Sequence, residues 1–313
     1  MVMIGISKEK KLNLLGQLLL LLATVAWGTS FIILSKTIEE VNELFVLCIR
    51  FLVSGLMLGL IFLKKIIKIN KTSLFRGVIL GVILSLAYII QTYGLKITTP
   101  SRNAFLTSSY CVMVPFIVWI MTKNAPKLYN VLSAVLCLIG IGFVAFSSQT
   151  EAEKGYLIGD LLTVVCAVFY GLQLIFIDKY QQKGEDSVTM LVIELLTVGI
   201  ICGVVSLIVE LPFRPQGYSL NLSQITNIAY LTIVCTLFAQ LFLIFGQKFT
   251  TVNQSSIILS LEAVFGTVFS VILGDEKLTV GLILGFAIIF IAMMINELKL
   301  DPMKLLNNKK SIK

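Results

Sequence analysis

The sequence predicts an all-α integral membrane protein. Hydrophobic residues make up 57% of its 313 residues, only 13% are charged, and the mean hydropathy is +0.96. The apolar residues lie in long runs, and about 20 apolar residues in a helix are enough to cross the hydrocarbon core of a bilayer. Runs of that length recur along the whole chain, which leaves no stretch for a separate soluble domain.

These runs predict ten transmembrane helices joined by short polar links. The first run follows three lysines but continues past Trp27, which is too far for the apolar core of a cleaved signal peptide, so a retained helix is expected. The longest link, residues 212–217, has the Pro and Gly content of a loop. The ten predicted spans are residues 14–35, 44–63, 76–95, 102–121, 129–147, 157–177, 188–209, 227–246, 254–273 and 279–297.

Basic residues are distributed unequally between the two sides of these spans. With ten spans both termini share one side, and that side carries most of the Lys and Arg residues, which predicts that it is cytoplasmic. Arg102, the first residue of the fourth predicted span, is counted on the opposite side. The net charge of +8 is explained by these helix flanks, so the expected location is the cell membrane, with the lipid bilayer and not nucleic acid as a partner.

The sequence carries no signature of a cofactor or an active site. Its six cysteines lie inside apolar runs without a C-x-x-C pair, and it has no histidine, which argues against a disulfide framework or a zinc site. It has neither a Walker A sequence for ATP nor a G-x-S-x-G motif. We therefore expect no cofactor and no enzymatic activity.

An internal repeat divides the chain into two five-helix units. At an offset of 143 residues, Gly16-Gln17 matches Gly159-Asp160, and at an offset of 152 residues Gly94-Leu95 matches Gly246-Gln247. An odd number of helices inverts the second unit relative to the first, and in transporters such repeats place the substrate site at their interface near the bilayer midplane. The predicted units are residues 1–150 and 151–300, around a central cavity, with a cytoplasmic tail at 301–313.

Several short motifs, in order along both units, resemble the EamA-type branch of the drug/metabolite transporter superfamily. They are Trp27-Gly28, Arg50-Phe51, Gly94-Leu95, Gly159-Asp160, Leu259-Ser260-Leu261-Glu262 and Gly274-Asp275-Glu276-Lys277-Leu278. The sequence departs from the family where Cys111 and Ala263 replace the usual prolines. The resemblance implies ten helices around a central cavity, and the export or exchange of small metabolites, often amino acids.

Three charged residues inside predicted spans are candidates for function, because ionisable groups at midplane depth are costly unless they are paired or hydrated. They are Arg50, Glu194 and Glu262. Arg50 and Glu194 follow Trp27-Gly28 and Tyr170-Gly171 at nearly equal intervals, so we expect both to face the interior, near each other; alternatively each reaches the membrane surface. Glu262 is expected to bind a substrate ammonium or a coupling proton, or else to be a structural acid.

Polar and aromatic residues at helical spacing extend this set of candidates. Asn103, Thr107 and Tyr110 share one helix face, and the repeat relates Tyr88 to Gln240 and Trp27 to Tyr170. Each of them could instead serve helix packing, but together they favour a cavity. The predicted substrate-binding residues are Trp27, Arg50, Tyr88, Gln91, Asn103, Thr107, Tyr110, Tyr170, Glu194, Gln240 and Glu262.

The function predicted from these residues is secondary transport of a small molecule. An intramembrane enzyme would need a catalytic group of residues, and a structural or signalling protein would need neither midplane charges nor an inverted repeat. A multidrug or nucleotide-sugar carrier is the alternative within transport. The G-x-x-x-G formed by Gly55 and Gly59 is interpreted as packing within a monomer, which is the expected state.

Overall fold

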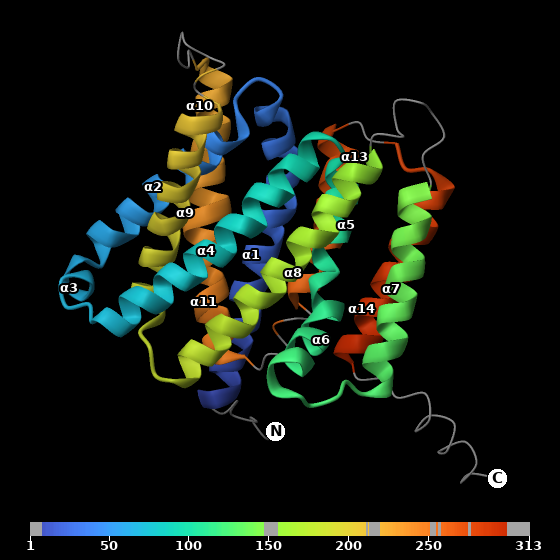
Figure 1. Ribbon diagram of the computed structural model, residues 1–313, viewed down its shortest axis with the longest axis horizontal. Helices are drawn as coiled ribbons and strands as arrows, with labels where there is room; N and C mark the ends of the chain where they lie inside the picture. Colours follow the sequence, from blue (N-terminus) through green and yellow to red (C-terminus); the bar gives the residue numbers. More distant parts are fainter. Residues whose placement is uncertain are drawn as a thin grey trace, which may run out of the picture.

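The computed structural model describes residues 8–146, 156–210, 212, 220–250, 255, 258–274 and 277–298 as a bundle of helices, and no β-strand occurs in these ranges (Figure 1). The predicted tail at 301–313, and the predicted 212–217 loop apart from Pro212, lie outside them. The helices of the first half are α1 (Lys8–Ile38), α2 (Glu43–Ile61), α3 (Leu63–Ile66), α4 (Lys71–Lys96), α5 (Pro100–Ser108), α6 (Tyr110–Thr122) and α7 (Leu128–Phe146). Those of the second half are α8 (Tyr156–Gln182), α9 (Ser187–Val209), α10 (Leu222–Thr232), the π-helix η3 (Ile233–Phe238), α11 (Ala239–Phe249), α13 (Glu262–Gly274) and α14 (Val280–Glu297).

The length and hydropathy of these helices confirm a polytopic helical membrane protein. In the described part of the chain, seven segments are long and apolar enough to cross a bilayer. Three further apolar helices, at Leu128–Val144, Ile258–Leu273 and Val280–Ile295, are shorter. The prediction of an all-α membrane fold is therefore confirmed, and the exact number of ten crossings stays a prediction.

Two predicted spans that the structure describes throughout are interrupted well inside their ends. The span predicted at 102–121 begins at Pro100 and is divided at Ser109 into α5 and α6. The span predicted at 227–246 contains η3 between α10 and α11. Hydropathy reports how apolar a segment is but not the hydrogen-bond pattern of its backbone, so neither irregularity could be read from the apolar runs.

Local side chains define where several helices begin. Thr99 caps α5 and Pro100 occupies its first turn, where a missing N–H has no cost. The side chains of Asn221 and Gln224 form a reciprocal capping box at the start of α10. These residues fix the ends of the helices, while the apolar faces determine how the helices pack.

Glycines allow the backbones of α2 and α9 to pack very closely. A Cβ added at Gly199 would lie 2.6 Å from the backbone nitrogen of Leu52, and one at Gly55 would lie 3.0 Å from that of Leu196. Gly203 lies against Cys48, so the two helices run antiparallel. The predicted packing role of Gly55 within the monomer is thus consistent with the structure.

We expect Gly199→Val to destabilise the protein by roughly 1–3 kcal/mol, because the new side chain must displace the backbone of α2. Gly142→Ala is the matched control, since a Cβ at Gly142 on α7 would meet nothing within 4 Å. Denaturant unfolding of both variants in detergent micelles would measure the difference. Equal stabilities of the two variants would contradict the tight α2–α9 contact.

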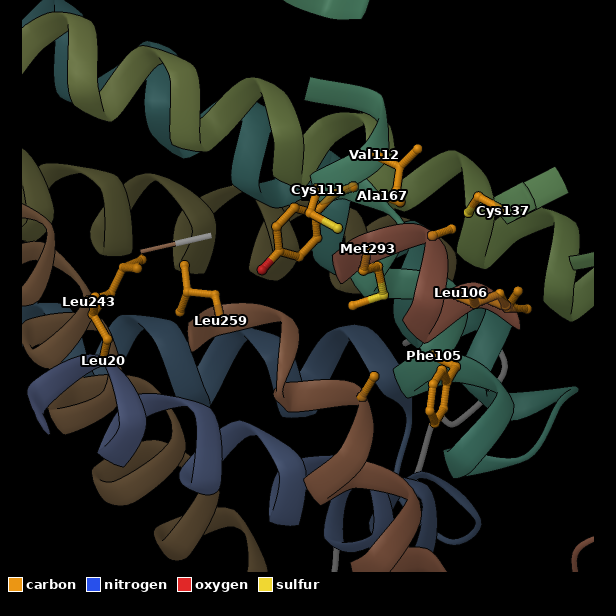
Figure 2. Packing of buried hydrophobic residues seen from close by; sticks show 14 of the residues in the cluster. Leu20, Phe105, Leu106, Cys111, Val112, Cys137, Ala167, Leu243, Leu259 and Met293 are labelled. Carbon is orange, nitrogen blue, oxygen red and sulfur yellow. The ribbon is translucent and has the colours of Figure 1, made fainter. Parts of the chain in front are cut away.

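A large apolar cluster runs through the bundle and has most of its members on α5, α6, α8 and α14. Phe105 and Phe286 stack at 4.2 Å between ring centroids, and Leu106, Cys111 and Met293 lie close by (Figure 2). All six cysteines are free thiols, and five of them are buried between helices. The cluster holds these helices together, and Tyr110, Leu243 and Leu259 in it also line the cavity described below.

The turn between α8 and α9 carries a helix cap with pH-dependent strength. The side chain of Asp186 accepts hydrogen bonds from the Thr189 N–H at 3.0 Å and from Lys65 at 2.7 Å. Burial raises the pKa of Asp186, but the hydrogen bonds from Lys65 and Thr189 outweigh it and hold this pKa below its usual value. A carboxyl with a depressed folded pKa adds stability above its unfolded pKa, and this contribution is lost as pH falls through the folded pKa.

Asp186→Ala should therefore cost about 1 kcal/mol of stability at neutral pH through loss of the cap. Its ion pair with Lys65 adds little, because both side chains are about half exposed. The difference between wild type and variant should vanish in strong acid, where Asp186 is protonated in both states. Thermal unfolding at neutral and at strongly acid pH would check this, and a difference that persists in strong acid would contradict it.

Candidate functional site

A cavity lies in the middle of the bundle, between helices from both halves of the chain. It is lined from α1, α4, α5, α6, α8, α11 and α13 and by Leu259, and it contains about 600 Å³ of space, including open solvent at its mouth. Eight of the eleven predicted residues line it: Trp27, Tyr88, Gln91, Thr107, Tyr110, Tyr170, Gln240 and Glu262.

Aromatic side chains form one wall of the cavity. The rings of Tyr88 and Tyr170 meet edge to face, with centroids 5.6 Å apart, and Phe51 supports Tyr88 from behind at 4.7 Å. The indole N–H of Trp27 donates to the Cys235 carbonyl oxygen at 3.1 Å. Edge-to-face contacts and this hydrogen bond hold the rings in fixed positions, so the wall is largely preformed.

Amide and hydroxyl groups form a second, connected part of the lining. Gln91 donates to the Thr107 hydroxyl at 3.0 Å and accepts from the Tyr170 hydroxyl at 2.7 Å. These two bonds link α4, α5 and α8 through one side chain. Gln240, on the opposite half, has a buried side-chain oxygen with no hydrogen-bond partner among the described residues. Such an acceptor can receive a hydrogen bond from a solute.

Glu262 places a single carboxylate in this lining. It is 8% exposed, it is the first residue of α13, and none of the residues that the structure describes donates a hydrogen bond to it. Of the described residues that line the cavity, none is Lys or Arg. The described lining of the cavity therefore offers an acid without an opposing base.

Arg50 is buried as predicted, but it lies behind the cavity wall. Its guanidinium sits over the Tyr88 ring, 5.1 Å from the centroid, and donates to the Thr236 hydroxyl and to the Cys235 carbonyl oxygen, the latter at 3.1 Å. Both acceptors belong to η3, and π-helical turns are frequent at functional sites because they redirect backbone groups. The same Cys235 oxygen also accepts from Trp27, so this turn supports the aromatic wall.

Glu194 is fully buried, and it too lies outside the cavity lining. One of its carboxylate oxygens accepts from the amide nitrogen of Gln173 at 2.6 Å, and the other has no partner within the described part of the chain. Gln173 does line the cavity, and the sequence analysis missed it. Its polar side chain inside an apolar run, two residues after Gly171 in α8, was the available signal.

The structure does not bring Arg50 and Glu194 together, contrary to the expectation that they are neighbours. In the antiparallel α2–α9 contact Gly203 lies against Cys48 and Gly199 against Leu52, so Arg50 lies opposite residue 201. Seven residues (201 − 194) separate this level from Glu194, which is about 10 Å along a helix axis. Similar positions in the two units thus place these residues at different depths.

Asn103 also lies outside the cavity lining. Its amide nitrogen donates to the Thr163 hydroxyl at 2.7 Å and to the Gln91 carbonyl oxygen at 3.3 Å. Asn103 therefore ties α5 to α8 and α4. It affects the cavity by helping to position Gln91.

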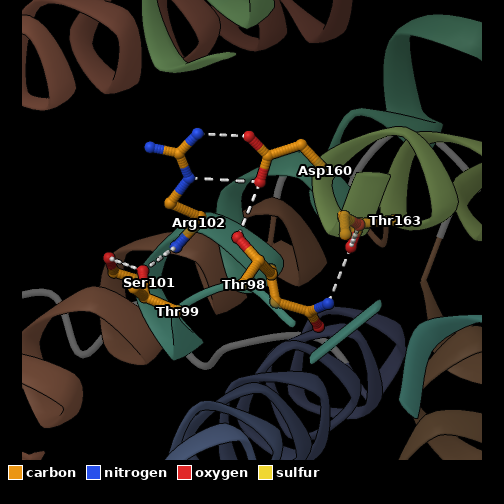
Figure 3. A network of polar contacts seen from close by, with 8 residues as sticks. Thr98, Thr99, Ser101, Arg102, Asp160 and Thr163 are labelled. Atoms are coloured by element: carbon orange, nitrogen blue, oxygen red, sulfur yellow. Dashed lines mark hydrogen bonds and ion pairs between the residues drawn. The ribbon is translucent and has the colours of Figure 1, made fainter. Parts of the chain in front are cut away.

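Arg102 was predicted as the first residue of the fourth span, but the sequence analysis did not foresee that its side chain is buried and paired. Arg102 lies in the first turn of α5, and its side chain is 2% exposed and pairs with Asp160 of α8 through both carboxylate oxygens (Figure 3). Thr98 donates to Asp160 at 2.7 Å, and the Tyr156 ring lies 5.3 Å from the guanidinium. An acid in an apolar run, at Asp160, was the sequence signal that a buried basic partner was needed.

The fold and site define a class: a polytopic helical membrane protein with a preformed, partly polar cavity between two halves of its chain, which is the architecture of a transporter. The EamA-like transporter family matches residues 14–146 and 157–297, and the chain belongs to this family.

Comparisons with individual proteins agree with this assignment. The chain is 27% identical over 288 residues to an uncharacterized transporter of Archaeoglobus fulgidus, covering 92% of this chain and 87% of that protein. It is 25% identical over 142 residues to purine permease 3 of Arabidopsis thaliana, covering 43% of this chain and 40% of the permease. A solved crystal structure shares the fold with a TM-score of 0.65 at 14% identity, covering 90% of this chain and 95% of that one.

Proposed function

We propose that this protein is a secondary transporter that exports or exchanges small amino-bearing metabolites, amino acids above all, across the cell membrane. In this proposal it acts as a monomer by alternating access between two inverted five-helix units, residues 1–150 and 151–300, which make ten crossings. Both termini, including the tail at 301–313, are cytoplasmic. α1 begins and α14 ends at the same end of the bundle, which supports this topology (Figure 1).

The observation that carries the proposal is the Glu262 carboxylate, which pairs with none of the described residues, in a cavity lined by aromatic and amide groups. A substrate ammonium would supply the missing opposite charge, and a charge-assisted hydrogen bond is roughly twice as strong as a neutral one. The rings of Trp27, Tyr88 and Tyr170 would contact the apolar part of the solute. Amide donors, such as the Gln240 nitrogen, would bind its carboxylate.

Two close helix crossings support the inverted repeat. A Cβ added at Gly94 would lie 2.9 Å from the Gly159 carbonyl oxygen, and one at Gly16 would lie 3.0 Å from the Gly246 carbonyl oxygen. The repeat relates Gly16 to Gly159 and Gly94 to Gly246. Exchanging each glycine for its repeat equivalent therefore converts the Gly94–Gly159 crossing into the Gly16–Gly246 crossing. Each crossing joins one half to the other, above or below the cavity.

A nucleobase carrier is the second candidate, because flat aromatic walls with amide groups also suit a purine and because one relative is named a purine permease. A nucleotide sugar fits less well, since its phosphates call for basic groups and the described cavity lining has none. A carrier of cationic drugs would use Glu262 in the same way as an amine carrier.

Proteoliposomes with purified protein would separate these candidates. They would be loaded with unlabelled solute, and counterflow of labelled amino acids, purines, nucleotide sugars and cationic dyes would be measured. We expect amino acids to be exchanged and nucleotide sugars to be excluded. If purines or dyes are exchanged and no amino acid is, the amino-acid carrier is rejected in favour of a nucleobase carrier or a carrier of cationic drugs, respectively.

A further inference from the structure

We propose that Glu194 is a proton-binding site and that Gln173 connects it to the cavity, so that transport is coupled to protons through this residue. The proposal rests on the proposed transport function and adds the coupling ion to it. Glu194 contacts no solute in this arrangement, because it is not part of the described cavity lining.

The carboxyl group of Glu194 is buried and has few hydrogen-bond partners. Glu194 is 0% exposed, and Gln173 is its one hydrogen-bond partner among the described residues. The second oxygen has neither a donor nor an acceptor there. An ionised carboxylate in such a place would be costly, so the group holds a proton in this conformation.

Several helices surround Glu194, and each carries ionisable groups. The helices that pack against α9 are α2, α4 and α11, and Gln173 reaches it from α8. Their ionisable groups at membrane depth, apart from thiols, are Arg50 on α2, Arg76, Tyr88 and Tyr93 on α4, and Asp160 and Tyr170 on α8, while Lys248 lies in the last turn of α11. Arg76 pairs with Glu185, and Asp160 pairs with Arg102. In the described structure none of these bonds to Glu194, and Arg50 is engaged by η3. No fixed cation therefore replaces the proton.

Gln173 provides a route from Glu194 to the cavity. The Gln173 side chain lines the cavity and donates to Glu194, so one side chain separates the buried acid from the space that a solute and water occupy. Rotation of Gln173 would open this path. Glu194 would then release its proton as a carboxylate, and it would take up one proton again when the cavity faces the other side of the membrane.

A purely structural role would leave Glu194 protonated throughout the cycle. Buried acids that serve structure usually have all their polar atoms satisfied, and here one oxygen is not. The open hydrogen-bonding position, together with its place one side chain from the cavity, distinguishes Glu194 from Asp160, whose carboxylate is bonded on both oxygens.

Infrared spectroscopy of the purified full-length protein would test the proton site without any substrate. At neutral pH we expect the carbonyl-stretch band of protonated carboxyls to lose one component in Glu194→Gln, and this component to remain in Glu262→Gln, the matched control. In Gln173→Leu the same band should shift, because its hydrogen bond is lost. Retention of the full band in Glu194→Gln would overturn the proposal.

Transport coupling would be tested in proteoliposomes with an amino acid that the counterflow panel finds to be carried. With the membrane potential clamped at zero, a pH gradient of about one unit drives about tenfold accumulation when one proton exchanges for one solute. We expect this in wild type and in Glu194→Asp, and no accumulation in Glu194→Gln, although counterflow continues in all three. Accumulation by Glu194→Gln equal to that of wild type would overturn the proposal.

The two proposals fail in different ways. If wild type exchanges no solute of the panel, the proposed function fails, and the infrared comparison still tests the proton site. If solutes are exchanged but the infrared band does not depend on Glu194, the carrier stands and this site is rejected.

Discussion

Replacing Asp160 with Ala is expected to destabilise the protein by about 3–5 kcal/mol, because the substitution leaves the Arg102 guanidinium buried without its partner. Both side chains are 2% exposed, so neither solvent nor lipid headgroups replace the lost contact. Thr98 would also lose its acceptor, the Asp160 carboxylate. Arg102→Met should have an effect of similar size for the opposite reason, since it leaves a buried acid unpaired.

The double variant Arg102→Met/Asp160→Leu provides the control. Replacing both members of a buried ion pair by apolar residues is often neutral or stabilising by about 1–4 kcal/mol. We therefore expect the double variant to regain most of the stability that either single variant loses. Denaturant unfolding in micelles, analysed as a double-mutant cycle, would give the coupling energy, and simple additivity of the two single effects would contradict the paired geometry.

The second large effect is expected for Glu262→Gln, which should weaken binding of amine-bearing solutes roughly 10- to 100-fold, the equivalent of a lost hydrogen bond to a charged group. The substitution keeps the shape of the side chain and removes its charge. A neutral purine, if carried, should be affected much less, because it brings no ammonium to the cavity.

Glu39→Gln is the matched control for this experiment, because Glu39 is an exposed acid outside the central cavity. Competition of unlabelled solute against labelled solute in counterflow would give the apparent affinities. An unchanged affinity for amino acids in Glu262→Gln would remove Glu262 from the binding site and would leave the cavity without its only acidic contact among the described lining residues.

Much of the candidate site could be predicted because polar residues are rare inside apolar helices. Tyr88, Gln91 and Gln240 stand out in their spans, and each of them lines the cavity. Asn103 stands out equally, yet it bonds to Thr163 and Gln91 outside the lining. A polar residue in a span must find a partner or face water, and the sequence does not distinguish between these two outcomes.

The sequence by itself determined that this chain is a helical membrane protein, since each apolar run in lipid must satisfy its own backbone hydrogen bonds and a helix does so within one segment. Tertiary structure alone decided which side chains meet across helices. Helix rotation and the antiparallel α2–α9 register set Arg50 and Glu194 about two turns apart. The start of α5 brought Arg102 to Asp160, and the rotation of α8 turned Gln173 toward both Glu194 and the cavity. These contacts depend on distances between segments far apart in the chain, which a pattern along one segment does not contain.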